Sequence, residues 1–414
     1  MMTEARVKLR PDPVTGAAAL LLRLGVAVLA ILIPCAAVVS RRPLFVLMPI
    51  GAVLVILGSR LAPERRPRTI ARLTRATKST LGIATLLLVF WAGLSLAWTA
   101  FPNLAFDHFL KAAGTALIAL LALGSLPNRV RGANSNLLAI GVAGAAIAVI
   151  AVAILDPQAA RIKDVEANTI QRAAIGVIVL SWPALGALAL RERFLASGIL
   201  AAVVAFAAAL IWSPAALAAL ILAILVFSLA YNNPVRMGLA LGALAAAALV
   251  LAPVIPLAVT NMFSGRIDAH DAMAAFPAWA AIIKSDGWRV MSGHGFDASV
   301  RAYMSGRLAE TAPRGLLFEV WYELGAVGAC IMATLLFQAF QTAGRAPRTT
   351  APYLLATLTC IFALSALGLP LGQLWWLTLL GVASICFAIA TRSQENPIRI
   401  HAPVLGAASP SSAA

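Results

Sequence analysis

Apolar runs of about twenty residues recur along almost the whole chain, and they constrain the fold more than any other feature of the sequence. A helix needs roughly 20 apolar residues to cross the hydrocarbon core of a bilayer. The runs are rich in Leu, Ala, Val and Ile and lack the short alternating segments of a membrane β-barrel. They therefore predict an all-α, polytopic integral membrane protein.

On this template the sequence predicts twelve spans. They cover residues 17–39, 43–59, 79–99, 107–126, 136–155, 171–190, 194–212, 214–231, 236–259, 316–342, 351–369 and 371–391. The connections near 192 and 213 are short, so the two spans beside them form either a tight hairpin or a pair with one half-buried member. Only 12% of the residues are charged, against about a quarter in soluble domains. Lipid must therefore solvate much of the chain.

Basic residues predict the orientation of the spans, because Lys and Arg collect on cytoplasmic loops. Seven of them lie between residues 60 and 78, and others lie near 129–131, 191–193, 236, 345–348 and 392–399. These are alternate connections in the twelve-span scheme. Both termini are therefore predicted to be cytoplasmic. The same bias explains the net charge of +16, so no nucleic-acid partner is expected.

The longest predicted connection, residues 260–315, divides the chain. It follows nine spans within residues 1–259 and precedes three within residues 316–391. Its apolar stretch 272–283 contains Trp279 and predicts a helix lying at the membrane interface. Long connections are more often functional than incidental. The last residues, 392–414, are predicted to form a disordered cytoplasmic tail.

Motifs of soluble enzymes are missing from the sequence. It has no Gly-rich phosphate loop, no HExxH and no nucleophile elbow, and its four cysteines lie in apolar stretches without metal-ligand spacing. We therefore expect neither a metal nor a cofactor.

Arginines on the non-cytoplasmic connections are the candidate ligand-binding residues. A guanidinium holds phosphate oxygens bidentately and stays charged. A cluster of such groups at the outer membrane face is what a lipid-linked pyrophosphate would require. The candidates are Arg172, Arg266, Arg289, Arg301 and Arg314. They can equally pair with carboxylates or lipid headgroups.

The candidate catalytic residues are His294 and Glu319. His294 stands between two glycines and is either a base or a turn residue. Glu319 and Glu323 lie four residues apart at the start of a predicted span, on one helix face. Carboxylates at membrane depth are costly, so they serve either chemistry or pairing with an arginine.

Four short stretches between about residues 90 and 330 stand out together. They are Leu94–Pro102, Asn168–Pro183, Trp279 with Gly293–Phe296, and Gly315–Gly325 followed by Gly328. In order and spacing they resemble the O-antigen ligase and polysaccharide polymerase superfamily of bacterial inner membranes. A large outer loop late in a twelve-span chain is also typical of that family.

The resemblance implies a membrane glycosyltransferase of lipopolysaccharide biosynthesis that uses no metal and no nucleotide sugar. The implied donor is a glycan on undecaprenyl pyrophosphate at the periplasmic face. The implied acceptor is lipid A-core, a growing glycan or a protein hydroxyl. Arginines such as Arg172, which matches the family pattern, would neutralise the departing pyrophosphate.

The sequence departs from the family pattern at two places. The family's His-Asn pair, which includes the proposed base, falls on Arg314 and Gly315, and an expected arginine falls on Ala275. A guanidinium does not act as a base. The chain is thus either a transferase that uses His294 or a carboxylate, or a non-catalytic relative, unless the loop aligns differently. The alternative from another class is a twelve-span secondary transporter or lipid-linked sugar flippase.

Overall fold

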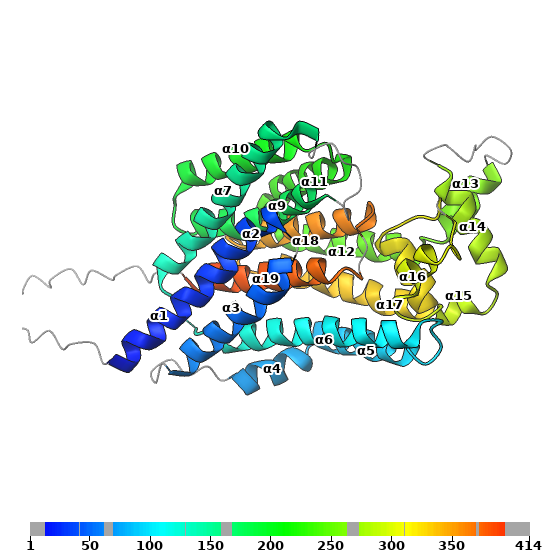
Figure 1. The fold of residues 1–414 in the computed structure, drawn as a ribbon, viewed down its shortest axis with the longest axis horizontal. Coiled ribbons are helices and arrows are strands. Elements are labelled where there is room, and N and C mark those ends of the chain that lie inside the picture. Colours follow the sequence, from blue (N-terminus) through cyan, green and yellow to red (C-terminus); the bar gives the residue numbers. More distant parts are fainter. Residues whose placement is uncertain are drawn as a thin grey trace, which may run out of the picture.

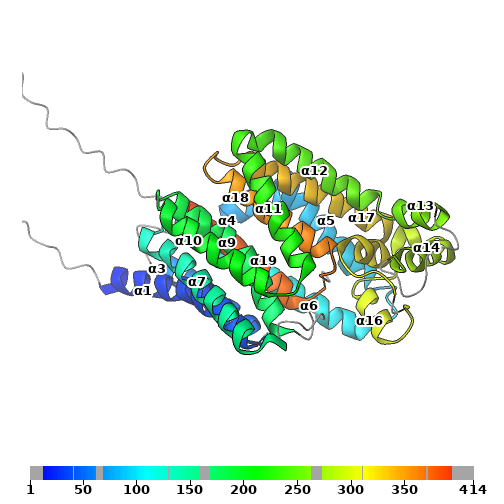
Figure 2. The same cartoon turned by 90° about the horizontal axis from the view of Figure 1, so that it is seen from above.

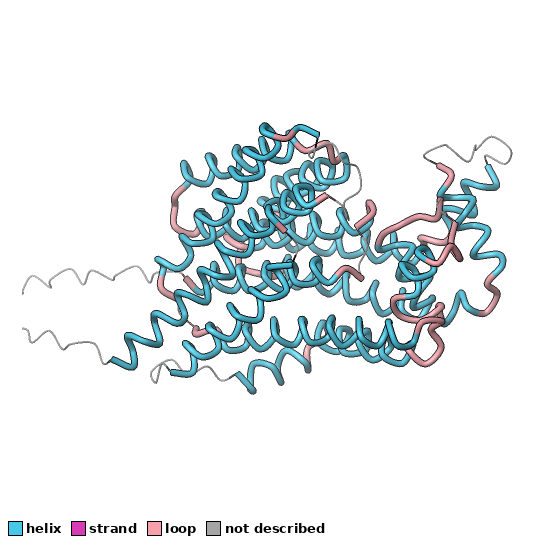
Figure 3. The backbone as a smooth tube through the Cα atoms, in the orientation of Figure 1, coloured by secondary structure: helices cyan, strands magenta, loops and turns pink. Residues whose placement is uncertain are grey.

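The computed structural model describes residues 13–40, 42–61, 69–128, 130–158, 168–262, 273–309, 311–369 and 372–393. Every regular element within these residues is a helix (Figure 3). The elements are α1 Pro13–Ala27, η1 Val28–Leu32, α2 Ile33–Val39, α3 Arg42–Leu61, α4 Thr69–Thr77, α5 Thr80–Ser95, α6 Pro102–Ser125, α7 Gly132–Leu155, α9 Thr169–Ala189, α10 Phe194–Leu210, α11 Pro214–Asn232, α12 Pro234–Val250, α13 Val254–Met262, α14 Ala275–Ser285, α15 Arg289–Ser292, α16 Ala298–Met304, α17 Leu316–Gly344, α18 Ala351–Ala366 and α19 Leu374–Arg392. The all-α prediction is confirmed for this part of the chain.

Eight helical segments in the described residues are long and apolar enough to cross a membrane, and the number rises to ten if each of two bent pairs is one span. These are the helices of a multi-pass membrane protein. The predicted spans 194–212 and 351–369 correspond to α10 and α18, which have only 17 and 16 residues. Length and composition therefore support eight to ten spans, and the predicted count of twelve is not confirmed.

One predicted span is a bent helix pair, and a second bent pair begins in the connection before the predicted span 79–99. The span at 236–259 consists of α12 and α13, which meet at 64°, and α4 precedes α5 at an angle of 78°. Pro253 and Pro256 stand at and just after the first bend. Proline lacks the backbone N–H that a continuous helix needs, so a break at this point has a direct cause.

The centre of the bundle is α9, which packs against α7, α10, α2, α19 and α18. It is buried along almost its whole length, because 94% of its most apolar 18-residue stretch lies inside the protein. It lies between α10 and α19 in the view of Figure 2. Asn168 caps its N-terminus by accepting bonds from the backbone N–H groups of Ile170 and Gln171. Arg172 in the first turn is thereby held at a defined place within the bundle.

One end of the bundle carries the short helices α13, α14, α15 and α16, and α5 ends and α6 and α17 begin beside them (Figure 1). This end is called the loop end below. The start of α1 and the end of α19 lie at the opposite end (Figures 1 and 2). The predicted interfacial helix at 272–283 corresponds closely to α14.

Candidate functional site at the loop end

Carboxylates gather at the loop end of the bundle. Seven Asp and Glu residues lie in the described part of the chain. Five of them belong to the start of α6, the end of α14, the segment before α16 and the start of α17: Asp107, Asp286, Asp297, Glu319 and Glu323. Charged groups at membrane depth are costly and mark functional regions. The loop end is therefore the candidate region for a functional site.

A break in α17 shapes this region. Gly325 has φ 64° and ψ −165°, a conformation open essentially to glycine alone. The carbonyls of the three preceding residues accept bonds from outside the helix. Tyr322 O accepts from His294 N at 2.8 Å, Glu323 O from Gly295 N at 2.9 Å, and Leu324 O from Trp91 Nε1 at 2.9 Å. The break thus ties α5 and the segment 293–297 to α17.

The same segment is held from its other side by the end of α5. Ser95 Oγ accepts a bond from Phe296 N at 2.9 Å. Gly295 has φ 102°, and a Cβ there would lie 2.6 Å from Thr99 Cβ, so glycine permits the close approach. Three of the four stretches that carry the family resemblance, around residues 94–102, 293–296 and 315–328, therefore meet in space.

A cavity with a volume of about 580 Å³ lies at the loop end. It is called the cationic cavity below. Its lining comes from α3, α6, α16 and the start of α19: Arg42, Phe45, Asp107, His108, Lys111, Asp297, Val300, Arg301, Met304, Gly372, Gln373, Leu374 and Trp375. Three permanent cations face two carboxylates there, and the remaining lining is largely apolar. The cavity therefore suits an anionic ligand with an apolar part.

Asp297 organises the cationic cavity. Its side chain is 2% exposed, and its two oxygens face different partners, with Oδ1 2.9 Å from His108 Nδ1 and Oδ2 3.1 Å from Arg301 Nε. His108 Nδ1 lies close to this carboxylate, but the geometry of the contact does not meet that of a hydrogen bond. Lys111 pairs with Asp107 at 2.6 Å, but both side chains are largely exposed and the pair adds little stability.

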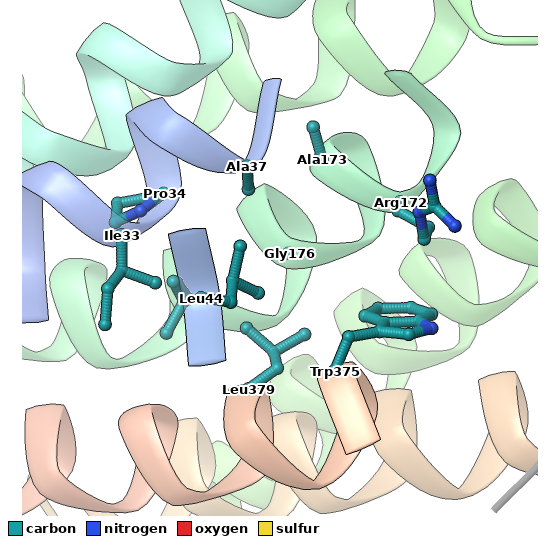
Figure 4. A pocket seen from close by; sticks show the side chains of 10 residues that line it. Ile33, Pro34, Ala37, Leu44, Arg172, Ala173, Gly176, Trp375 and Leu379 are labelled. Carbon is teal, nitrogen blue, oxygen red and sulfur yellow. The ribbon is translucent and has the colours of Figure 1, made fainter. Parts of the chain in front are cut away.

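Arg172 lies next to the cationic cavity. Its side chain is buried and donates to Thr169 Oγ1 at 3.2 Å. With Trp375 it lines one end of a narrow apolar crevice whose other end is formed by Ile33 and Pro34 (Figure 4). The crevice holds about 20 Å³, room for no more than a water molecule. Trp375 also lines the cationic cavity, so one side chain links Arg172 to it.

A second cavity, of about 320 Å³, lies on another side of α16. It contains two of the predicted site residues, Arg314 and Glu319. Arg314 Cζ lies 3.9 Å from the centre of the Tyr303 ring, a cation–π contact. Glu319 is buried, with 5% of its surface exposed. The two cavities share Val300 and Met304 of α16 in their linings.

His294 and Arg289 lie apart from both large cavities. Both line a crevice of only about 20 Å³. Each ring nitrogen of His294 has a protein partner, because Nδ1 lies 3.0 Å from Tyr322 O and Nε2 lies 3.3 Å from Asp286 Oδ2. Its ring also stacks on Tyr322 at 4.1 Å. These contacts lock His294 in place and leave neither nitrogen facing a ligand-sized space.

The predicted site residues are therefore distributed unevenly. Arg301 lines the cationic cavity, Arg172 adjoins it, and Arg314 and Glu319 line the second cavity, whereas His294 and Arg289 share the small crevice. Arg266 lies outside the described residues. Across the described ranges, no group of three or more His, Cys, Asp or Glu side chains is placed to hold a metal ion.

Sequence reasoning missed His108, Asp297, Arg42 and Lys111 as site residues. Asp107 and His108 are a polar pair near the start of an apolar run, which is a usable signal. Lys111 resembles any lysine whose long side chain reaches the interface from a span end. Only the folded arrangement brings these residues of α3 and α6 to Asp297 and Arg301.

Comparisons of the chain with protein-family models, with curated proteins and with solved structures found no match. The function is therefore inferred from the geometry of the loop end.

Proposed function

We propose that this protein is a metal-independent membrane glycosyltransferase of the O-antigen ligase and polymerase type, which takes a glycan from undecaprenyl pyrophosphate. The observation that carries the proposal is the cationic cavity, where Arg42, Lys111 and Arg301 meet an apolar wall of Phe45, Leu374 and Trp375. A pyrophosphate with a prenyl tail fits both features, because its phosphates can contact the cations and its tail can contact the apolar wall.

The arginines give the cavity its chemistry. As the glycosidic C–O bond breaks, negative charge grows on the departing pyrophosphate. Arg301, which lines the cavity, is held in position by Asp297. Preorganised guanidinium groups stabilise this charge without rearranging during the reaction.

The second cavity is the proposed place of the acceptor. Buried Glu319 and the nearby hydroxyl of Ser299 can hydrogen-bond to the hydroxyls of a sugar, and Arg314 adds a cation for an acidic group. Lipid A-core and a growing glycan chain both present such groups. Val300 and Met304 of α16 line both cavities, so an acceptor held in the second cavity would extend its reacting hydroxyl around this helix into the cationic cavity.

The proposed setting is a bacterial inner membrane crossed by twelve spans. The loop end would face the periplasm and both termini the cytoplasm. Undecaprenyl-linked glycans are displayed on the periplasmic side, which agrees with a polar cavity at the end opposite the start of α1 and the end of α19.

A second candidate function is transport or flipping of a lipid-linked sugar. The bent pairs α4–α5 and α12–α13 and the break at Gly325 favour it, because transporters build their sites from discontinuous helices. Transporter sites lie near the middle of the membrane, however. The cavities described above lie at one end of the bundle.

Surface glycans of a strain that lacks the protein provide the test. We expect the strain to lose lipid A-linked or long-chain glycan on gels, and wild type to restore it. Arg42→Ala and Arg301→Ala should each restore it poorly, since both arginines line the cationic cavity and losing one charged contact to phosphate weakens binding by about 10- to 100-fold. Arg345→Ala, an exposed arginine at the opposite end, is the matched control. An unchanged glycan profile in the deleted strain would sink the proposal.

Purified protein in liposomes separates the transferase from the flippase. A transferase releases undecaprenyl pyrophosphate and elongates an added acceptor glycan. A flippase moves the lipid-linked glycan across the bilayer and leaves its glycosidic bond intact. A non-catalytic relative would bind the donor and do neither.

A further inference from the structure

His108 lines the cationic cavity, and one of its ring nitrogens lies against a carboxylate. Nδ1 contacts the buried carboxylate of Asp297, and the side chain is 15% exposed. Nε2 has no protein partner within the residues that the structure describes. The ring also packs against Phe296, with centroids 5.9 Å apart, which restricts its rotation. An imidazole held in this way against a carboxylate can take a proton from a ligand in the cavity.

We propose that His108 Nε2 accepts the proton of the acceptor hydroxyl during glycosyl transfer, and that Asp297 stabilises the imidazolium that forms. This inference rests on the proposed function. It concerns a different histidine from the one that the sequence pattern selects. A buried carboxylate beside an imidazole stabilises the charged ring without taking the proton itself.

The acceptor oxygen forms a bond to the anomeric carbon of the donor while its proton passes to His108 Nε2. The bond between that carbon and the pyrophosphate oxygen breaks, and its electron pair stays on the pyrophosphate. The products are the glycosylated acceptor, undecaprenyl pyrophosphate and an imidazolium, which returns its proton to water.

The charges around His108 permit this role. Asp107 and Lys111 come from its own helix, Asp297 and Arg301 from α16 and the segment before it, and Arg42 from α3. Lys111 is paired with Asp107, and Arg301 is shared with Asp297. From the start of α19, the cavity lining contributes Gln373 and Trp375, which carry no charge.

His294 provides the internal comparison. It too lies beside an aspartate, but its Nε2 is the nitrogen that faces Asp286, and its Nδ1 is taken by Tyr322 O. The small crevice around it leaves no room for a sugar. The two histidines thus form matched His–Asp pairs that differ in access to a large cavity.

The experiment uses the full-length protein in liposomes with undecaprenyl-pyrophosphate-linked glycan. His108→Asn removes Nε2 and keeps a polar group near Asp297. We expect its release of undecaprenyl pyrophosphate to fall at least about 100-fold, the usual contribution of a general base. Binding of undecaprenyl pyrophosphate itself should change less than threefold. In His108→Ala, added imidazole should restore part of the rate, a readout that a structural role would not produce.

The outcomes separate the two proposals. If wild type releases no undecaprenyl pyrophosphate, the proposed function fails and this inference falls with it. If wild type is active and His108→Asn retains its rate, only the role of His108 is overturned. A rate lost in His294→Asn and rescued there by imidazole would likewise assign the proton to His294. The thermal unfolding of each variant is measured in detergent as a control. A variant that unfolds at a much lower temperature than wild type has lost its rate through misfolding and not through loss of the base.

Discussion

Among single residues, Asp297 has both an unusual backbone conformation and a buried charge. Its backbone has φ 61°, in the left-handed region, and its buried side chain is shared between His108 and Arg301. Asparagine and aspartate adopt the left-handed conformation more readily than other non-glycine residues. The position therefore selects a short polar side chain for its backbone and a negative charge for its neighbours.

Asp297→Asn and Asp297→Ala separate these two demands. Both variants lose the charge that faces His108 and Arg301, but alanine adds backbone strain of about 1 kcal/mol or more. We expect both to lower the unfolding temperature in detergent micelles, with Asp297→Ala lower than Asp297→Asn. Equal unfolding temperatures for the two variants would contradict a cost from the backbone conformation.

The residue scale is also where sequence reasoning reached its limit. Arg301, Arg314 and Glu319 were recognisable as polar residues near a predicted span, and they line the two large cavities. His294 was selected for the glycines around it. Those glycines serve a close approach to α17 and α5, because Gly293 and Gly295 both have positive φ and a Cβ on either would meet neighbouring backbone or side chain within 2.6 Å.

At the scale of helices, the break in α17 decides how the loop end is assembled. A regular helix would use the carbonyls of Tyr322, Glu323 and Leu324 internally. Here all three accept bonds from outside the helix. Periodicity predicts a continuous span at 316–342, because the apolar pattern runs through Gly325 without interruption.

Gly325→Ala tests the importance of the break. A Cβ at this position would lie 2.4 Å from Met291 O and would clash with it. The φ of 64° also disfavours any residue with a Cβ, so alanine does not fit here. We expect destabilisation of about 3 kcal/mol or more and loss of folded protein. Gly114→Ala in α6 is the control, since nothing lies within 4 Å of its Cβ and alanine favours a helix by up to about 1 kcal/mol. Size-exclusion profiles and unfolding temperatures in detergent measure the folded yield and the stability of the two variants. Equal yields of folded Gly325→Ala and Gly114→Ala would show that the fold does not need glycine at the break.

At the scale of the whole molecule, the arrangement has two chemically different ends. The loop end holds five of the seven described carboxylates and both large cavities. The opposite end holds arginines that donate hydrogen bonds to backbone carbonyls. Arg72 Nη1 donates to Leu126 O at 2.6 Å, and Arg392 Nη1 donates to the same oxygen at 2.8 Å. Cations near the C-terminus of α6 stabilise the helix dipole there.

Labelling of introduced cysteines tests which end faces which compartment. The four native cysteines are all free and would be replaced first. Ser305→Cys lies at the loop end and Thr349→Cys at the opposite end, and both positions are exposed. We expect a membrane-impermeant maleimide to label the first in spheroplasts and the second only after lysis. The reverse pattern would contradict a periplasmic site, and labelling of both in spheroplasts would contradict the two-ended arrangement.

The sequence by itself determined the fold class. About twenty apolar residues in a row can satisfy their backbone in lipid only as a helix, so composition and run length suffice to predict a multi-pass all-α protein. It also predicted a functional role for the segment before α17, since polar residues concentrate there. These inferences depend on local properties that a chain carries before it folds.

The tertiary structure alone decided which polar residues share a cavity. His108 and Asp297 come from helices far apart in the chain and meet because the broken α17 holds the segment 293–297 against the end of α5. The lengths of α10 and α18 and the bends at α4–α5 and α12–α13 were decided in the same way. Contacts between distant segments leave no periodic trace in the sequence, and so the site emerged only when the helices were packed.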